Sequence, residues 1–316
     1  RGFRSESSVE MTKSGEEKAN GGENGKVEEL DLKACLEVAL KCAKGAGEMI
    51  RKTFRSGIRD QKKTETDPVT ETDLACEKFI KETIEKAFPD HEFLGEEGYT
   101  GTGTGESYNL SDRPTWVCDP VDGTANFLHG LAWTCVSIAL VVKAQPVVGV
   151  VYNPVSEELF TAVKGQGAFL NESQRLQPSS VTELTNACIC TEFGANRDPE
   201  VVKRKVQLMQ RVVMAPVQAV RCLGSCALNM CSVAAGRLDA YYEWGMHPWD
   251  VAASWLICAE AGARVSDLDG SDMTLTKRRT AVANTHIHHK LLAVLTDEAG
   301  EADGLMPWGQ KRARTE

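Results

Sequence analysis

The first apolar pattern along the chain has the spacing of an amphipathic helix. Leucine, alanine and isoleucine side chains recur every three or four positions, at Leu32, Leu36, Ala39, Ala43, Ala46 and Ile50. This spacing places them on one face and predicts a helix over about residues 30–55. The same period predicts a second helix over about residues 73–87, in which Glu77 and Lys81 form an i,i+4 pair on the outer face.

The middle of the chain has the pattern of short strands. β-Branched and other apolar residues cluster in five segments, at 115–118, 135–142, 147–152, 159–163 and 168–170. The segments from 135 onward are separated by only a few residues, so we expect them to form a β-meander. A turn is predicted at 144–146, where Ala-Gln-Pro separates two of the strands.

Beyond about residue 180, strands and helices are mixed. The pattern predicts strands at 187–192, 238–243 and 280–284, and helices at 199–212, 225–235, 250–261 and 286–296. Because these elements do not repeat as strict βαβ units, they favour an α+β layered sandwich.

The two ends of the chain are polar and are not expected to join the fold. Residues 1–29 are predicted to be a disordered acidic tail and residues 301–316 a flexible one. Between them we expect two halves of one unit, an N-terminal α+β half over 30–185 and a C-terminal α/β half over 186–300.

Composition narrows the classes of function. The 316 residues include 45 acidic and 36 basic side chains, a formal net charge of −9. This acidic balance argues against a nucleic-acid partner, which normally meets a basic face. The longest apolar run, Ala132 to Val142, is too short for a membrane helix of about 20 residues, so we expect no membrane partner either.

The eleven cysteines bear on the cellular compartment. Their odd number and the lack of a C-x-x-C pair argue against a disulfide framework or a zinc site. Buried thiols in a reducing compartment are the simpler interpretation, and they predict a cytoplasmic protein. The chain starts at Arg1 rather than at Met, so targeting to an organelle is left open.

The segment that carries most chemistry is Trp116-Val-Cys-Asp119-Pro-Val-Asp122-Gly-Thr124. An apolar strand runs into two carboxylates, and the fixed φ of proline allows a sharp turn that aims both at one point. Gly123 permits close backbone approach, and the amides of Gly123 and Thr124 can form a phosphate-binding nest. Two carboxylates beside such a nest suit Mg²⁺. The alternative is an Asp-rich surface turn.

Three further acidic sites are ambiguous when each is taken alone. Glu96 lies in Gly-Glu-Glu-Gly and could be an ordinary loop carboxylate. Asp250 follows Trp249 at the start of a predicted helix, where it could be a helix cap. Asp73 ends the segment Asp-Pro-Val-Thr-Glu-Thr-Asp, in which Thr70 or Thr72 is a candidate N-cap for the second helix.

Together, these segments resemble the inositol monophosphatase family over about residues 30 to 297. The stretches W-V-C-D-P-V-D-G-T-A-N-F and W-D-V-A-A-S-W-L-I-C-A-E-A-G look like the two signature motifs of the family. The resemblance implies a layered αβαβα sandwich of the inositol monophosphatase/fructose-bisphosphatase type. It also implies a lithium-sensitive phosphomonoesterase that depends on two to three Mg²⁺ ions per site.

The resemblance implies metal ligands and catalytic groups by position. Around the first metal would lie Glu96, Asp119, the carbonyl of Val121 and Thr124. The second metal would be held by Asp119, Asp122 and Asp250, and Glu96 would also touch a weakly bound third ion. Asp73 and Thr124 would orient and deprotonate the attacking water, and Lys62 matches a family lysine near that site.

The resemblance also implies the groups that meet the substrate. Gly224, Ser225, Cys226 and Glu243 fall where the family contacts the inositol ring. The other implied substrate-binding residues are Glu96, Val121, Asp122, Gly123, Thr124 and Asp250.

The implied reaction is hydrolysis of inositol monophosphate to myo-inositol and phosphate, in inositol metabolism and phosphatidylinositol signalling, by a homodimer. Another small sugar phosphate, such as L-galactose 1-phosphate, is the main alternative substrate, because the catalytic residues are indifferent to the alcohol. A nucleotide bisphosphatase is disfavoured, because no segment suggests an adenine pocket. A non-catalytic metal-binding relative is disfavoured because the implied ligands and the Asp73–Thr124 pair are all present.

Overall fold

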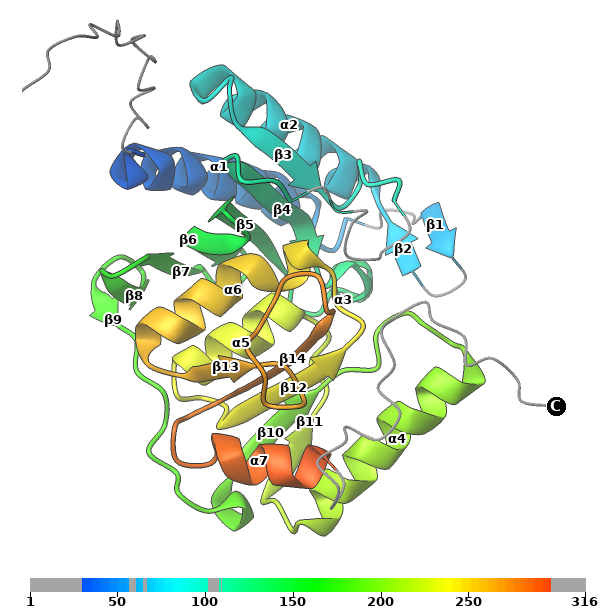
Figure 1. The fold of residues 1–316 in the computed structure, drawn as a ribbon. Coiled ribbons are helices and arrows are strands. Elements are labelled where there is room, and N and C mark those ends of the chain that lie inside the picture. The colour runs from blue at the N-terminus through cyan, green and yellow to red at the C-terminus, as the bar shows by residue number, and fades with distance from the viewer. Residues whose placement is uncertain (1–29, 57–60, 65–66, 102–107, 109, 297–316) are drawn as a thin grey trace, which may run out of the picture. The chain divides into compact units, whose positions relative to one another are not determined.

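Helices and two β-sheets alternate in layers in the computed structural model (Figure 1). The structure describes residues 30–56, 61–64, 67–101, 108 and 110–296. The chain divides into the units Arg1–Asp31 and Leu32–Glu316, and every described helix and strand lies in the second. The predicted tails, 1–29 and 301–316, lie outside the described residues. The predicted α+β layered sandwich is confirmed.

Helices α1 (Leu32–Thr53) and α2 (Glu71–Ala87) cover the outer face of the larger sheet (Figure 1). Both were predicted from the helical period, and their apolar faces are buried. The predicted solvent-facing pair of Glu77 and Lys81 is wrong. Glu77 is buried, and its Oε2 accepts a hydrogen bond of 2.7 Å from the backbone N–H of Glu97.

The larger sheet has seven strands in the order β3-β4-β5-β6-β7-β8-β9. These are β3 (Glu92–Gly95), β4 (Thr115–Asp122), β5 (Cys135–Val142), β6 (Gln145–Asn153), β7 (Glu158–Val163), β8 (Gly167–Leu170) and β9 (Gln174–Arg175). β3 is parallel to β4 and the other neighbours are antiparallel, so the predicted meander is confirmed. The short edge strands β3 and β9 were not predicted.

The turn between β5 and β6 lies at Lys143 and Ala144, whose φ angles are 50° and 57°. The predicted turn at 144–146 is therefore displaced, because Gln145 and Pro146 belong to β6. Pro146 pairs with Val141 where the register shifts. Such an irregularity accommodates a residue that has no N–H to donate to the ladder.

The smaller sheet has five strands in the order β11-β10-β12-β14-β13. They are β11 (Ala219–Arg221), β10 (Cys188–Thr191), β12 (Ala240–Trp244), β14 (Arg279–Ala283) and β13 (Arg264–Ser266). Strands β11, β10 and β12 are mutually parallel, and β14 is antiparallel to both of its neighbours. The three inner strands were predicted, whereas the three-residue edge strands were not.

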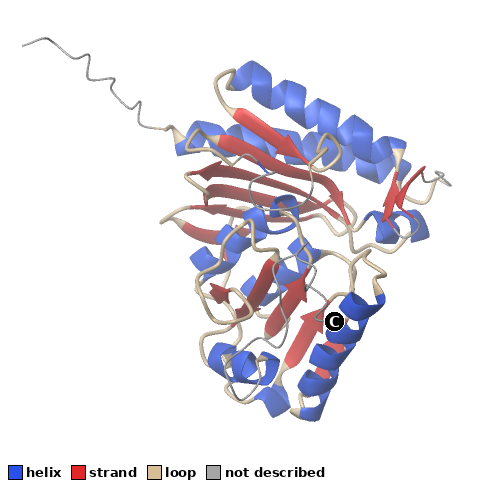
Figure 2. Cartoon of the chain, turned by 45° about the vertical axis from the view of Figure 1, so that its right-hand side comes forward, coloured by secondary structure: helices blue, strands red, loops and turns tan. Residues whose placement is uncertain are grey.

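Helices α5 (Cys226–Ala234) and α6 (Pro248–Ala261) lie between the two sheets, as both views show (Figures 1 and 2). They are rich in small residues, and α6 approaches β6 so closely that a Cβ on Gly149 would lie 2.7 Å from the carbonyl oxygen of Ala253. Helices α4 (Pro199–Met214) and α7 (His288–Leu295) cover the other face of the smaller sheet. Leu184–Asn186 forms a short 3₁₀ turn before β10.

Two short elements complete the region that contains the acidic motifs. The hairpin β1 (Gln61–Thr64) and β2 (Asp67–Val69) precedes α2, and helix α3 (Thr124–His129) follows β4 directly. Because α5 and α6 lie between the two sheets, both helices also reach the end of β4. Across the described ranges, no helix combines the length and apolar character needed to span a bilayer.

Candidate active site

The end of β4 is a corner that brings the chain from a buried strand into α3. The strand continues through Pro120 to Asp122, and Gly123 has a φ of 87° before α3 begins at Thr124. A Cβ on Gly123 would lie 2.8 Å from the carbonyl oxygen of Trp133 and 3.1 Å from that of Gly224. Glycine is therefore required at this position for two reasons: a side chain would collide with neighbouring backbone, and the φ angle is positive.

Asp73 and Thr124 meet at the start of α2. Thr70 is the N-cap of this helix, and Asp73 accepts hydrogen bonds from the backbone N–H of Thr70, at 3.0 Å, and from its hydroxyl. The other oxygen of Asp73 lies 3.0 Å from the hydroxyl oxygen of Thr124, which also lies 3.0 Å from the carbonyl oxygen of Val121. The Thr124 hydroxyl has one proton, which it can donate to either acceptor; when it donates to Asp73, that proton can pass to the carboxylate.

Negative charges converge beside this pair. The charge of Glu96 raises the pKa of Asp73, Asp122 and Asp250, and the charge of Asp122 adds to the effect on Asp250. In each case burial is the larger cause; it raises the pKa of Asp122 to about 6 and that of Asp250 well above its usual range. These carboxylates therefore lie close enough to repel one another.

Backbone and hydroxyl donors hold the carboxylates in place. Asp122 accepts hydrogen bonds from the Ser225 hydroxyl at 2.5 Å and from the Ala227 N–H at 2.8 Å. Asp250 accepts one from the His247 N–H at 2.7 Å, and Asp119 accepts one from the Val121 N–H at 2.9 Å. Asp250 is the third residue of α6 rather than its cap, which is His247.

The chemistry of the donor set fits a hard divalent cation. Glu96, Asp119, Asp122, Asp250 and the carbonyl of Val121 supply only oxygen, the ligand type that Mg²⁺ takes. A nearby cation would offset the mutual repulsion of the carboxylates. Within the part of the chain that the structure describes, no three acidic, His or Cys side chains are already drawn together as a closed cage.

The residues predicted to meet the substrate lie around the start of α5 and on β12. Gly224 is exposed, whereas Ser225 is buried and is the N-cap of α5. The side chain of Cys226 is buried, and burial raises its pKa well above the usual range. Glu243 on β12 accepts a hydrogen bond from the Tyr241 hydroxyl. Lys62 falls in β1, and its side chain lies outside the described part.

A network that the sequence did not reveal joins these parts. Glu192, just after β10, accepts hydrogen bonds through one oxygen from the N–H groups of Leu223 at 2.6 Å and Gly224 at 2.7 Å, and from the Asn229 side chain at 2.9 Å. The Asn126 side chain donates to the carbonyls of Trp133, at 2.8 Å, and Leu223, at 2.7 Å. Asn126 belongs to the motif W-V-C-D-P-V-D-G-T-A-N-F, but no sequence motif includes Glu192.

A second unpredicted group supports Asp250. The His247 ring stacks on Trp249, with centroids 4.6 Å apart and planes at 3°. Its Nε2 lies 2.8 Å from an Arg278 guanidinium nitrogen, and its Nδ1 lies 2.8 Å from the Tyr108 hydroxyl. Because guanidinium can only donate, Nε2 accepts and Nδ1 carries the proton. The ring is thus neutral and fixed, and its backbone N–H stays aimed at Asp250.

We expect Glu192→Ala to lower the free energy of unfolding by about 2 kcal/mol, because two backbone amides and one side-chain amide lose their acceptor. Glu192→Gln keeps a carbonyl oxygen and should lose less than half of this. Urea unfolding of metal-free protein measures both. Glu183→Ala, which breaks an exposed ion pair with Lys290, is the control and should cost less than about 1 kcal/mol. An equal loss in Glu183→Ala would contradict the role assigned to Glu192.

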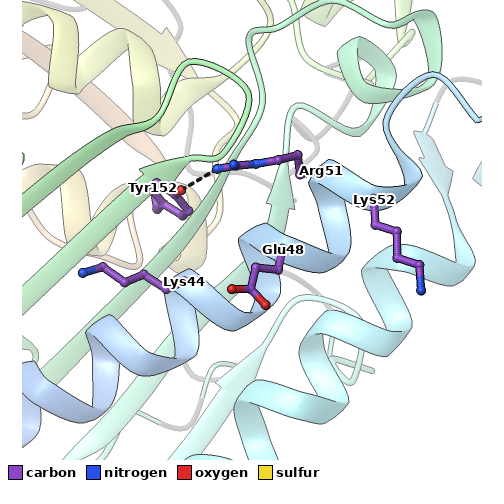
Figure 3. Close-up of a pocket in the computed structure, with 5 residues that line it drawn as sticks. All are labelled: Lys44, Glu48, Arg51, Lys52 and Tyr152. Atoms are coloured by element: carbon purple, nitrogen blue, oxygen red, sulfur yellow. Dashed lines mark hydrogen bonds between the residues drawn. The ribbon is translucent and has the colours of Figure 1, made fainter.

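A separate depression of about 400 Å³ is lined by Lys44, Glu48, Arg51, Lys52 and Tyr152, on α1 and β6 (Figure 3). Lys44 and Arg51 already form ion pairs with Glu172, at 2.9 Å, and Glu157, at 2.8 Å. It contains none of the acidic residues that converge on Thr124. We therefore do not assign the chemistry to this depression.

Comparison with known proteins gives the relatives of this chain. The chain matches the model of the inositol monophosphatase family over residues 31–301. Inositol monophosphatase 2 of Solanum lycopersicum is 46% identical over 263 residues, covering 83% of this chain and 98% of that protein. Inositol monophosphatase 1 of Homo sapiens is 39% identical over 254 residues, covering 80% and 90% respectively.

The fold has solved counterparts. The crystal structure of the extragenic suppressor protein suhB from Bartonella henselae matches with a TM-score of 0.75 at 34% sequence identity. The match covers 84% of this chain and 99% of that one. The resemblance predicted from the two sequence motifs is therefore confirmed. The chain belongs to the inositol monophosphatase family.

Proposed function

We propose that this protein hydrolyses inositol monophosphate to free myo-inositol and inorganic phosphate, with a water molecule activated by bound metal. The observation that carries this function is the convergence of Glu96, Asp122 and Asp250 beside the Asp73–Thr124 pair. Membership of a metal-dependent family that acts on small phosphomonoesters supports it.

Two to three Mg²⁺ ions are the proposed cofactors. Glu96, Asp119, the Val121 carbonyl and Thr124 would hold one, Asp119, Asp122 and Asp250 a second, and Glu96 would touch a third. When bound, such ions lower the pKa of a coordinated water and neutralise charge that develops on the phosphate and the leaving oxygen.

The protein groups then have distinct tasks. The Thr124 hydroxyl donates to Asp73 and so can accept a proton from the attacking water as its own passes to the carboxylate. The amides of Gly123 and Thr124 are fixed at the β4–α3 corner, where they can donate to phosphate oxygens as charge spreads over them. Lys62 is proposed to lie near this end of the site.

The alcohol side is proposed to face Gly224, Ser225, Cys226 and Glu243. The charges of Asp122 and Asp250 interact with that of Glu243, which supports a role for Glu243 beside the proposed metal ligands. A carboxylate in this place accepts hydrogen bonds and so favours an alcohol that carries several hydroxyl groups.

Phosphate release over a panel of esters tests this function. We expect Mg²⁺-dependent release from inositol 1-phosphate to exceed release from L-galactose 1-phosphate and from an adenosine bisphosphate, and lithium to inhibit it. Greater release from the galactose ester would transfer the function to a sugar phosphatase. Absence of release from every ester, with Mg²⁺ present, would favour a non-catalytic metal-binding relative.

Two further proposals concern the setting of the enzyme. We propose a homodimer, which sedimentation equilibrium of the full chain would test by its mass. All eleven cysteines are free thiols in the structure, and thiols persist in reducing compartments, so the cytoplasm is the proposed location.

A further inference from the structure

Lys205 is a buried lysine that the proposed reaction does not use. It lies on α4, where it is 8% exposed although its neighbours Lys203 and Val206 are exposed. Its ammonium donates to the carbonyl oxygen of Phe193 at 2.8 Å and lies 3.5 Å from that of Glu192. Burial of a cation is costly unless other groups compensate it, so the surroundings of this ammonium should explain its position.

The compensating charges come from Glu243 and Glu192, both of which act to raise the pKa of Lys205 against the larger, lowering effect of burial. A Cβ built on Gly194 would lie 3.5 Å from the Lys205 ammonium and 3.7 Å from Oε1 of Glu243, so both charged groups border the same space. Lys205 and Glu243 also line one cavity of about 10 Å³. A cavity of that size holds about one water molecule, so the space that the two side chains share contains little water.

The charges around Glu243 shift the pKa of its carboxyl group in opposite directions. Its pKa is raised to about 7, chiefly by burial and further by the charges of Glu192 and Asp122, whereas the charge of Lys205 and the hydrogen bond from Tyr241 act to lower it. The charged and titratable groups that interact with Glu243 from neighbouring elements are Lys205 on α4, Cys190 on β10, Glu192 after β10, Tyr241 on β12, Cys222 after β11, Cys226 at the start of α5, Asp122 on β4, Asp250 on α6 and Arg278 before β14. Without Lys205 the carboxyl would therefore be protonated over more of the neutral range.

Lys205 also ties the same end of the site together through the backbone. Its ammonium holds the segment 192–193, and Glu192 in turn accepts from the amides of Leu223 and Gly224. One lysine thus contacts the segment that shapes the turn before α5 and borders the space beside Glu243.

From this arrangement we propose that Lys205 is a specificity-determining positioning residue, which keeps Glu243 a hydrogen-bond acceptor for the hydroxyl groups of a polyol substrate. The inference rests on the proposed function, because it assumes that Glu243 faces the alcohol. Lys205 acts through Glu243 and does not touch the phosphate, so it should affect recognition of the alcohol and leave the chemical step unchanged.

The kinetic test compares two esters in Lys205→Met and in the control Lys203→Met, which removes an exposed lysine from the same helix. With inositol 1-phosphate, we expect Lys205→Met to raise KM about tenfold, the loss that follows from weakening a hydrogen bond to a charged group, with kcat unchanged. With phenyl phosphate, whose leaving group carries no further hydroxyl group, KM should stay within about twofold. The KM increase should be larger at pH 6.5 than at pH 8.5, because loss of the cation raises the pKa of Glu243.

A double-mutant cycle identifies the route of the effect. In a Glu243→Gln background, Lys205→Met should change KM for inositol 1-phosphate by less than about twofold, because the group it acts through is already neutral. A tenfold increase in that background would overturn the inference, as would equal KM increases for both esters. Lys205→Gln, which keeps a donor for the Phe193 carbonyl, replaces Lys205→Met if the latter does not fold.

A measurement without turnover separates this inference from the proposed function. The pH titration of the ¹³C-labelled Glu243 carboxyl, assigned by its loss in Glu243→Gln, should move to higher pH in Lys205→Met and not in Lys203→Met. An unchanged titration would overturn the inference even if inositol 1-phosphate is the preferred substrate. If wild-type protein releases no phosphate, the proposed function fails, and this titration still decides whether Lys205 controls Glu243.

Discussion

Replacement of Asp122 by asparagine is expected to lower kcat for phosphate release about 1,000-fold, the loss typical of removing one main electrostatic group from an active site. Asp122 is a proposed metal ligand, and its position is fixed by Ser225 and Ala227. An amide in the same place cannot supply the negative charge that holds a divalent cation. Steady-state phosphate release at saturating Mg²⁺ measures the effect.

The Asp122→Asn substitution should not destabilise the folded protein. In the metal-free protein, burial raises the pKa of Asp122 to about 6, so the folded state binds more protons than the unfolded state between about pH 4 and pH 6. Stability therefore falls as pH rises through this range, and at neutral pH the ionised group carries a penalty that asparagine removes.

We accordingly expect the metal-free Tm of Asp122→Asn to equal or exceed that of the wild type, and Mg²⁺ to raise it less. Asp112→Asn makes the same chemical change at an exposed position before β4 and should leave both turnover and the Mg²⁺ effect unchanged. Near-normal turnover in Asp122→Asn would contradict the assignment of this carboxylate.

Replacement of Thr124 by valine is expected to lower kcat between about 100- and 10,000-fold while KM changes little, because the hydroxyl serves proton transfer. Valine keeps the shape of the side chain but removes the group that bridges Asp73 and the Val121 carbonyl. Initial rates over a range of substrate concentrations separate the two constants.

Thr124→Ser is the matched control, since it keeps the hydroxyl and loses only a methyl group. It should retain turnover within about tenfold of the wild type. A valine variant that is as active as the serine variant would show that the hydroxyl does not handle the proton, and the hydrogen bond between Thr124 and Asp73 would then only join the starts of α2 and α3.

The sequence predicts those parts of the acidic site whose functional residues lie together in one short segment. Asp119, Asp122 and Thr124 follow a buried strand directly, so local backbone geometry alone brings them to one corner. Asp73, Glu96 and Asp250 are far apart in sequence, and only the resemblance to a family assigned them to the same site. No local pattern states that the starts of α2 and α6 meet the end of β4.

Positioning residues were harder to predict because their function depends on partners far along the chain. Glu77 has the helical spacing of a solvent-exposed residue, but β3 passes so close that a Cβ on Gly95 would lie 2.4 Å from its carboxylate. Glu192 binds amides 31 and 32 positions away. The edge strands were missed because two to four residues carry too little periodicity to separate a strand from a loop.

The bond between Asp122 and Ser225 spans 103 positions of the chain, and that between Asp122 and Ala227 spans 105. Contacts of such long range form only after the entropy of closing the intervening loop has been overcome, so they belong to the slow part of folding. During synthesis, Asp122 leaves the ribosome well before α5 and α6 exist. The recovery of phosphatase activity during refolding should therefore lag behind the recovery of helical circular dichroism.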